Sequence, residues 1–183
     1  MKLRMYKSEV DLLIDKTKKL KISSDNYESN NENFENYSMS IFIVGLPRCG
    51  STLVESILSL NNTVKDLGEV NIFEESYREY KLSEKQKSLS KIYWKKLEIT
   101  DNETITTNKW LFNYQYAGII AKAIPNAKII HCYRNPLDNI LSTYRAHFGT
   151  GNYFSSSLVD SAEVYSDQDE IMSTYKKEFK NHI

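Results

Sequence analysis

The segment 45-GLPRCGST-52 has residue types and spacing that could bind a phosphate group. Its glycines follow the G-x-x-x-x-G pattern of a phosphate-binding loop, but Ser51 and Thr52 stand where that motif continues Lys-[Ser/Thr]. An apolar run precedes the segment and a helical pattern follows it, so backbone N–H groups and a helix dipole would face an anion there. Arg48 supplies a cation within the loop in place of the lysine. We therefore predict a phosphate-binding loop; the alternative is an ordinary glycine- and proline-containing turn capped by a serine.

A second candidate anion site is the segment 134-RNPLDNILS-142. Arg134 follows the apolar run 128-KIIHCY-133, at the carboxyl end of a predicted strand, which is where ligands bind in open α/β sheets. Ser142 lies about two turns along a helix that Pro136 is expected to open. The alternative is that Arg134 is a surface charge and Ser142 an ordinary residue on a helix face.

Strands alternate with helices along the chain, which predicts an α/β domain with a mainly parallel sheet. Apolar or β-branched runs predict strands at 41–44, 104–109 and 128–133. Apolar spacing and capping patterns predict helices at 8–20, 53–58, 70–80, 83–97, 113–123, 136–147 and 167–179. Residues 23–38 are polar and rich in asparagine, which predicts a loop. We expect an N-terminal helix and linker at 1–39 and one domain at 40–183.

The composition argues against several functional classes. The 183 residues suit one domain, and 24 basic residues balance 24 acidic ones, which argues against a polybasic surface for nucleic acid or membrane. No apolar run is long enough for a signal peptide or a membrane span. Cys49 and Cys132 are expected to be reduced thiols of a cytoplasmic protein. Three scattered histidines and the lack of a Cys-x-x-Cys pair predict no metal site.

Several residues that could do chemistry also have plain structural explanations. His131 and Cys132 lie within a predicted strand and are expected to pack in the sheet. Cys49 is expected to serve as a small residue of the loop rather than as a redox site. Trp94 and Trp110 belong either to the core or to a substrate cleft, and the sequence leaves both possibilities open.

Together, the two anion motifs resemble those of the sulfotransferase superfamily, which uses 3′-phosphoadenosine 5′-phosphosulfate. P-R-x-G-[ST]-T after a strand looks like the family's 5′-phosphosulfate loop, and R-x(7)-S after a strand looks like its 3′-phosphate site. The likeness covers about residues 40–180 and is nearest to tyrosylprotein sulfotransferases and to bacterial sulfotransferases linked to tetratricopeptide repeats. Those carry Arg, where cytosolic members carry Lys, at the position of Arg48. A phosphosulfate has no γ-phosphate, so neither a triphosphate-clamping lysine nor Mg²⁺ is required.

The resemblance implies a P-loop-like three-layer α/β/α fold with a mainly parallel central sheet. It also implies which residues bind the donor: Arg48, Cys49, Gly50, Ser51, Thr52, Arg134 and Ser142.

Two more residues acquire roles from the resemblance. Glu69, in 66-DLGEVNIF-73, is similar to the tyrosylprotein sulfotransferase glutamate that takes the proton from an acceptor hydroxyl. Its alternative is an acid at the start of a helix. Lys109, in 107-TNKWLFN-113, resembles the lysine that donates to the bridging oxygen of the departing phosphate. Its alternative is a solvated lysine. The expected catalytic residues are therefore Glu69, Arg48 and Lys109.

The function that the sequence predicts is transfer of a sulfuryl group from 3′-phosphoadenosine 5′-phosphosulfate, without a metal, to a hydroxyl of a peptide, sugar or lipid. Family analogy favours a protein tyrosine as the acceptor. A homodimer is left open, and neither nucleic acid nor a membrane span is expected. One alternative is a P-loop kinase of a small molecule, against which the missing lysine and the R-x(7)-S element count. Another is a non-catalytic remnant, because the domain is expected to be incomplete at its C-terminal end.

Overall fold

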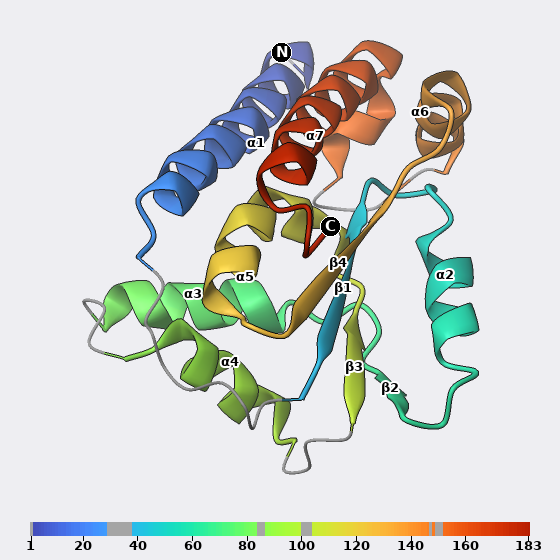
Figure 1. The fold of residues 1–183 in the computed structure, drawn as a ribbon. Helices are drawn as coiled ribbons and strands as arrows, with labels where there is room; N and C mark the ends of the chain where they lie inside the picture. Colours follow the sequence, from blue (N-terminus) through green and yellow to red (C-terminus); the bar gives the residue numbers. More distant parts are fainter. Residues whose placement is uncertain (1, 29–37, 84–86, 100–103, 147, 149–151) are drawn as a thin grey trace.

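The computed structural model describes residues 2–28, 38–83, 87–99, 104–146, 148 and 152–183 (Figure 1). These residues form a three-layer α/β/α domain around a four-stranded sheet in which every neighbouring pair of strands is parallel. The fold class therefore agrees with the predicted one. The strand order is β2-β3-β1-β4, with bounds β1 Ser40–Gly45, β2 Val64–Asp66, β3 Ile105–Asn108 and β4 Ala127–Cys132.

The parallel arrangement determines where the functional loops meet. Ser40 of β1 pairs with Thr106 of β3 on one side and with Ala127 of β4 on the other. The loops that follow these strands therefore leave the same edge of the sheet. This carboxyl edge carries the predicted phosphate loop after β1, Glu69 after β2, Lys109 after β3 and Arg134 after β4.

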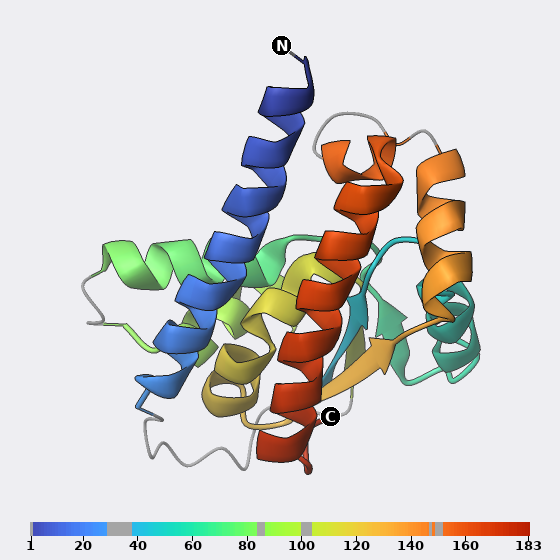
Figure 2. The same ribbon diagram turned by 90° about the horizontal axis from the view of Figure 1, so that it is seen from above.

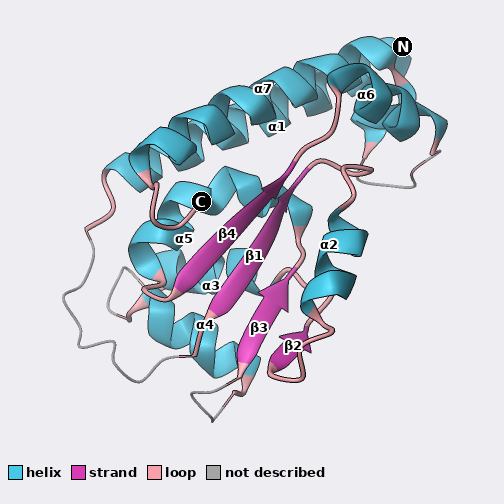
Figure 3. Ribbon diagram, turned by 45° about the vertical axis from the view of Figure 1, so that its right-hand side comes forward, coloured by secondary structure: helices cyan, strands magenta, loops and turns pink. Residues whose placement is uncertain are grey.

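Helices cover the sheet on two sides (Figures 1 and 3). On one side lies α2 (Ser51–Leu58). On the other side lie α3 (Ile72–Leu82), α4 (Leu89–Leu97) and α5 (Ala117–Ala123), the last preceded by the 3₁₀ helix η1 (Leu111–Tyr116). The core between the sheet and α3 and α4 is aromatic: the rings of Phe42 and Phe73 meet edge to face with centroids 5.7 Å apart, and Tyr93 packs on both.

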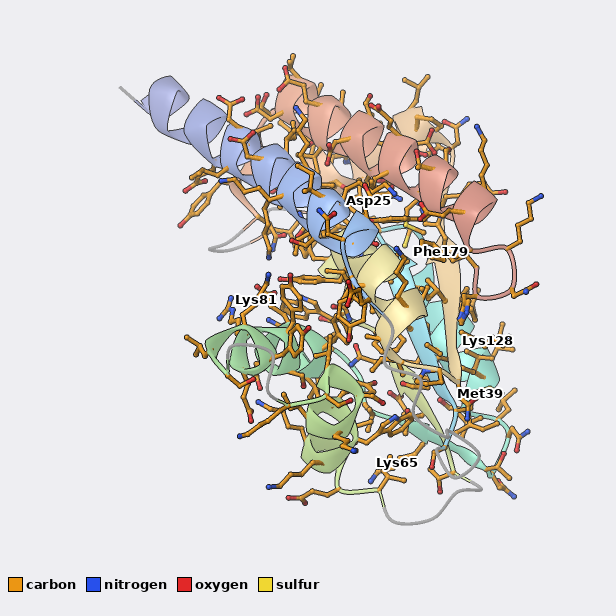
Figure 4. The ribbon with its side chains drawn as sticks, turned by 60° about the vertical axis from the view of Figure 1, so that its left-hand side comes forward. Asp25, Met39, Lys65, Lys81, Lys128 and Phe179 are labelled. Carbon is orange, nitrogen blue, oxygen red and sulfur yellow. The ribbon has the colours of Figure 1, made fainter. Side chains whose placement is uncertain are left out.

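The two longest helices, α1 (Lys2–Asp25) and α7 (Leu158–Glu178), lie side by side and run in the same direction (Figure 2). Lys21 Nζ lies 2.7 Å from a carboxylate oxygen of Glu178, which joins their C-terminal ends. Figure 4 accordingly labels Asp25 and Phe179 close together at these ends. The remaining helices are α6 (Pro136–Arg145), after β4, and the 3₁₀ helix η2 (Tyr153–Ser156), which leads into α7.

The structure corrects several element predictions. Ser83 does not open a helix: it ends α3, because its N–H donates to Glu79 O and its hydroxyl donates to Tyr80 O. The helix predicted at 113–123 is divided into η1 and α5, and the short helix predicted at 8–20 extends to the bounds of α1. β2 was not predicted. The start predicted for the last helix at 167 is also late, because Ser157 caps α7 by accepting from Asp160 N. Most of the predicted linker, 29–37, lies outside the described residues.

Candidate functional site

The loop between β1 and α2 has a tight backbone that requires glycine at two positions and places one non-glycine residue in a strained conformation. Gly45 lies against β4, where a Cβ atom would come within 2.4 Å of Cys132 O. Gly50 has φ 97°, and Arg48 has φ 69°, a left-handed conformation that non-glycine residues adopt rarely and that often marks functional sites. Among the described residues, no side chain caps α2. The first-turn N–H groups of α2 therefore face the loop without a side-chain cap, as an anion site requires.

Helix α6 holds this loop from one side. The buried side chains of Asn139 and Thr143 both donate to Pro47 O, at 3.0 and 3.3 Å. Ser142, the residue before Thr143 on this helix, also contacts the loop, because its Oγ accepts from Arg48 Nε at 3.2 Å. The two predicted anion motifs, 94 residues apart in the sequence, are thus in direct contact.

A cleft of about 420 Å³ opens where the two motifs meet, and it is basic. Among the described residues, the arginines that line it are Arg48, Arg134 and Arg145. Ser142 adds a hydroxyl, and Asp138, whose Oδ2 lies 3.9 Å from Arg134, is the one acidic residue of this lining. Three guanidinium groups against one exposed carboxylate leave an excess of positive charge, which suits a phosphate with a charge near −2.

The two cysteines meet beneath the loop. Contact with the Cys132 thiol lowers the pKa of Cys49; burial opposes this, and the N–H of Ser51 supports it, so that the pKa falls to about 7. The same contact raises the pKa of Cys132. The negative charge of a Cys49 thiolate is therefore stabilised mainly by Cys132 of β4, with a smaller contribution from Ser51. Cys132 lies at the strand end in a polar contact, which the prediction of simple packing in the sheet did not include.

A second cluster surrounds Lys109 on the other side of the loop. Lys109 Nζ lies 2.9 Å from Glu55 Oε2, 3.6 Å from Glu69 Oε1 and 3.4 Å from Thr52 Oγ1. Lys109 and Glu55 are buried, whereas 68% of the Glu69 side chain is exposed. Burial alone would lower the pKa of Lys109, but Glu55 and Glu69 outweigh it and raise that pKa above its usual value. Lys109 is therefore a cation next to the start of α2, and a solvated lysine is excluded.

Backbone bonds fix the position of this cluster. Lys109 N donates to Gly68 O at 3.0 Å, which ties the residue before Glu69 to the residue that carries the amine. Glu55 Oε1 accepts from the buried Thr107 hydroxyl at 3.1 Å, so β3 also holds the acid that faces Lys109. The carboxylate of Glu69 is thus held near Lys109, with most of its side chain exposed to solvent.

Some residues at the site were not predicted from the sequence. Glu55, Asn139, Thr143 and Arg145 all contact or line it. Asn139, Thr143 and Arg145 are all on α6, close to Ser142 in the sequence. Asn139 and Arg145 are each three residues from Ser142, a helical spacing that could have identified them as neighbours of the site. Glu55 had no such signal, because an acid in an amphipathic helix is ordinarily solvent-exposed.

The other residues of chemical interest lie outside these clusters. His131 is partly buried, and its Nε2 is hydrogen-bonded to Gln168 Nε2. Trp94 belongs to the core, whereas Trp110 lines a separate pocket. No group of three or more His, Cys, Asp or Glu residues in the described part of the chain is placed to hold a metal ion. None of the described helices is both long enough and apolar enough to cross a membrane.

Comparison with known proteins gives a family match and a similar protein. A family model described as "Sulfotransferase family" matches residues 71–183, which include Lys109, Arg134 and Ser142 but not the loop or Glu69. An "Uncharacterized protein" of Aquifex aeolicus (strain VF5) is 29% identical over 167 residues, which cover 78% of this chain and 22% of the relative. The chain thus spans about a fifth of that relative's length. Since the family model matches more than half of the residues, the chain belongs to the sulfotransferase family.

Proposed function

We propose that this chain transfers a sulfuryl group from 3′-phosphoadenosine 5′-phosphosulfate to an acceptor hydroxyl. The observation that carries the proposal is the contact between the two anion motifs, in which Arg48 bonds Ser142 beside a cleft lined by Arg134 and Arg145. A donor with phosphates at both its 3′ and 5′ positions requires two anion sites close together. A nucleoside triphosphate would use one loop with a lysine and a metal.

In this proposal the two ends of the donor occupy opposite sides of the loop. The 5′-phosphosulfate binds the first turn of α2 with Gly50, Ser51 and Thr52, next to Lys109. The 3′-phosphate binds Arg134, Arg145 and Ser142. Arg48 lies between them, because it belongs to the loop and also contacts Ser142. Cys49 contributes its backbone. Its thiol has to be protonated when the donor is bound, because a thiolate would repel the donor's negative charge.

The chemical step then needs one leaving group and one proton acceptor. The acceptor oxygen forms a bond to sulfur while the bond between sulfur and the bridging phosphate oxygen breaks. The electron pair of that bond remains on adenosine 3′,5′-bisphosphate, and the Lys109 ammonium, close to Thr52, donates a hydrogen bond to it. The exposed carboxylate of Glu69 takes the proton of the acceptor hydroxyl. Positioning and charge stabilisation supply most of the rate enhancement.

The acceptor in this proposal is a hydroxyl compound, and the family likeness favours a phenol such as the side chain of tyrosine. The test is transfer of ³⁵S-labelled sulfuryl from the donor to a panel of phenolic, sugar and lipid acceptors, with the wild type and Lys109→Met compared. We expect labelled product from the wild type and a loss of about 10²-fold or more in the variant. Equal labelling by both proteins would refute the role of Lys109, and labelling of no acceptor by the wild type would refute the proposed activity.

A further inference from the structure

A second cavity lies between the N-terminal helix and the carboxyl edge of the sheet. It has a volume of about 300 Å³, and we call it the α1 pocket. Aromatic side chains form much of its wall: Trp110, Phe112, Tyr153 and Phe154. Val10 and Leu13 of α1 add aliphatic surface, and Glu9, Lys16, Glu74 and Gln115 are its polar residues. A cavity of this size and character is at the small end of the range for small-molecule sites.

Two chain segments lead from the Lys109 cluster directly into this pocket. Trp110, which lines the pocket, is the residue after Lys109, so their Cα atoms are about 3.8 Å apart. Glu74, which also lines it, lies in the first turn of α3, five residues after Glu69. The segment that follows Gly68 and the segment that follows Lys109 begin side by side, because Lys109 N donates to Gly68 O. Two short segments of the chain therefore join the α1 pocket to the proposed transfer centre.

The two carboxylates of the α1 pocket are paired unequally. Glu74 has two cationic partners, with Lys16 Nζ at 3.0 Å and an Arg78 guanidinium nitrogen at 2.7 Å. Burial alone would raise the pKa of Glu74, but these partners lower it below its usual value. Glu9 is different: within the part of the chain that the structure describes, its buried Oε2 atom has no hydrogen-bond partner. This oxygen is shielded from solvent, so a ligand in the pocket would interact with Glu9 through the charge of its carboxylate.

Two further polar atoms of the lining are buried and have no partner among the described residues. They are Gln115 Oε1, an acceptor, and Trp110 Nε1, a donor. The other side of the Gln115 amide is fixed, because its Nε2 atom donates to Thr17 Oγ1 and to Leu13 O. Like the Glu9 oxygen, both atoms are shielded from solvent, so the polar character that the pocket offers a ligand comes mainly from the charged side chains that line it. Aromatic faces and an uncompensated carboxylate together favour a cationic group.

We infer that the α1 pocket binds the body of the acceptor and that this acceptor is a small phenol bearing an amine. The ammonium group pairs with the charge of the Glu9 carboxylate, the ring packs among the aromatic side chains, and the hydroxyl is directed toward Lys109 and Glu69. The assignment of the bound molecule as the acceptor rests on the proposed sulfuryl transfer. The preference for a cationic aromatic ligand rests on the pocket alone.

The test uses three phenols that share a 4-ethylphenol core and carry different charges at the end of the side chain. They are tyramine (cationic), 4-ethylphenol (neutral) and 3-(4-hydroxyphenyl)propionate (anionic). Their dissociation constants are measured by calorimetry at pH 7 with saturating adenosine 3′,5′-bisphosphate, and Trp110 gives a second signal by fluorescence. The variants are Glu9→Gln and, as a matched control on an exposed position of the same helix, Asp11→Asn. A melting curve establishes that each variant is folded.

We expect tyramine to bind the wild type at least about tenfold more tightly than 4-ethylphenol, and the propionate to bind weakest. Glu9→Gln should abolish this preference, and Asp11→Asn should retain it. Equal affinities for the three phenols, or an unchanged preference in Glu9→Gln, would overturn the inference. So would bisphosphate binding without binding of any phenol, an outcome that leaves the proposed function intact. If tyramine binds with the expected preference but neither bisphosphate binding nor sulfuryl transfer occurs, the pocket stands and the proposed function fails.

Discussion

Replacing Glu55 by glutamine should destabilise the fold strongly, because Glu55 is the main partner of a buried ammonium group. Both side chains of the Glu55–Lys109 pair are less than a tenth exposed, and their charged atoms are 2.9 Å apart. Glutamine retains an oxygen for the Thr107 hydroxyl, so the substitution removes the charge and leaves the 3.1 Å hydrogen bond in place. Removing one partner of a buried ion pair typically costs about 3–5 kcal/mol.

The structure places the expected cost at the low end of that range. Lys109 Nζ retains Glu69 at 3.6 Å, although that carboxylate is largely exposed and therefore weakly attractive. We expect a loss of about 3 kcal/mol in the free energy of unfolding, which corresponds to about 6–12 °C in Tm for a domain of this size. Urea unfolding followed by circular dichroism measures the loss.

A double-mutant cycle separates the buried charge from other effects. Glu55→Gln combined with Lys109→Met should cost less than Glu55→Gln alone, because no uncompensated charge remains. The control is Glu75→Gln, since Glu75 is exposed and lies 3.9 Å from Lys96; it should change stability by less than about 0.5 kcal/mol. If Glu55→Gln matched this control, or if the two substitutions were additive, the Glu55–Lys109 pair would not hold the site together.

Three further predictions concern single groups. Alkylation of Cys49 by iodoacetamide should reach half its maximal rate near pH 7 and should slow when the bisphosphate is added; a midpoint at the usual thiol value of about 8.5 would contradict the contact with Cys132. Burial lowers the pKa of His131 to about 4, so the unfolded chain takes up its proton first as the pH falls below about 6.5, and stability drops by about 2 kcal/mol at pH 4.5. Urea titrations of His131→Gln should lack this part of the loss, and an identical loss in wild type and variant would refute it. Arg145→Ala should weaken the bisphosphate about tenfold but leave adenosine 5′-phosphosulfate unchanged in calorimetry; equal weakening of both would remove Arg145 from the 3′ site.

Strands β1 and β4 and the two anion motifs could be predicted because their signals are local. Residues 41–44 form an apolar run that a central strand buries, and 128–133 combine isoleucines with polar residues, as a partly buried edge strand does; the structure confirms both strands. The three residues of β2 give no such signal, because Val64–Asp66 is an exposed or half-buried edge strand whose identity depends on its pairing with β3. The capping Ser157, three residues before Asp160, was a readable signal for the start of α7.

The missed parts of the candidate site depend on contacts that form only in the folded chain. Glu55 looks like the polar face of a helix, and it is buried because β3 brings Thr107 and Lys109 against it. The α1 pocket combines residues from α1, α3, η1 and η2, which are far apart in the sequence, and a short helix followed by a polar linker gave no reason to expect it. Motif spacing identifies anion-binding loops, whereas charge compensation and cavities follow from packing.

The binding of adenosine 3′,5′-bisphosphate compared with adenosine 5′-monophosphate tests the central claim most directly. The claim is that the loop and the cleft of Arg48, Arg134 and Arg145 bind the two ends of one nucleotide. Calorimetry with the full chain at pH 7, without Mg²⁺, should give at least about tenfold tighter binding of the bisphosphate, because the 3′-phosphate adds charge-assisted contacts in the cleft. Equal affinities for the two nucleotides, or no binding of either to folded protein, would contradict the account.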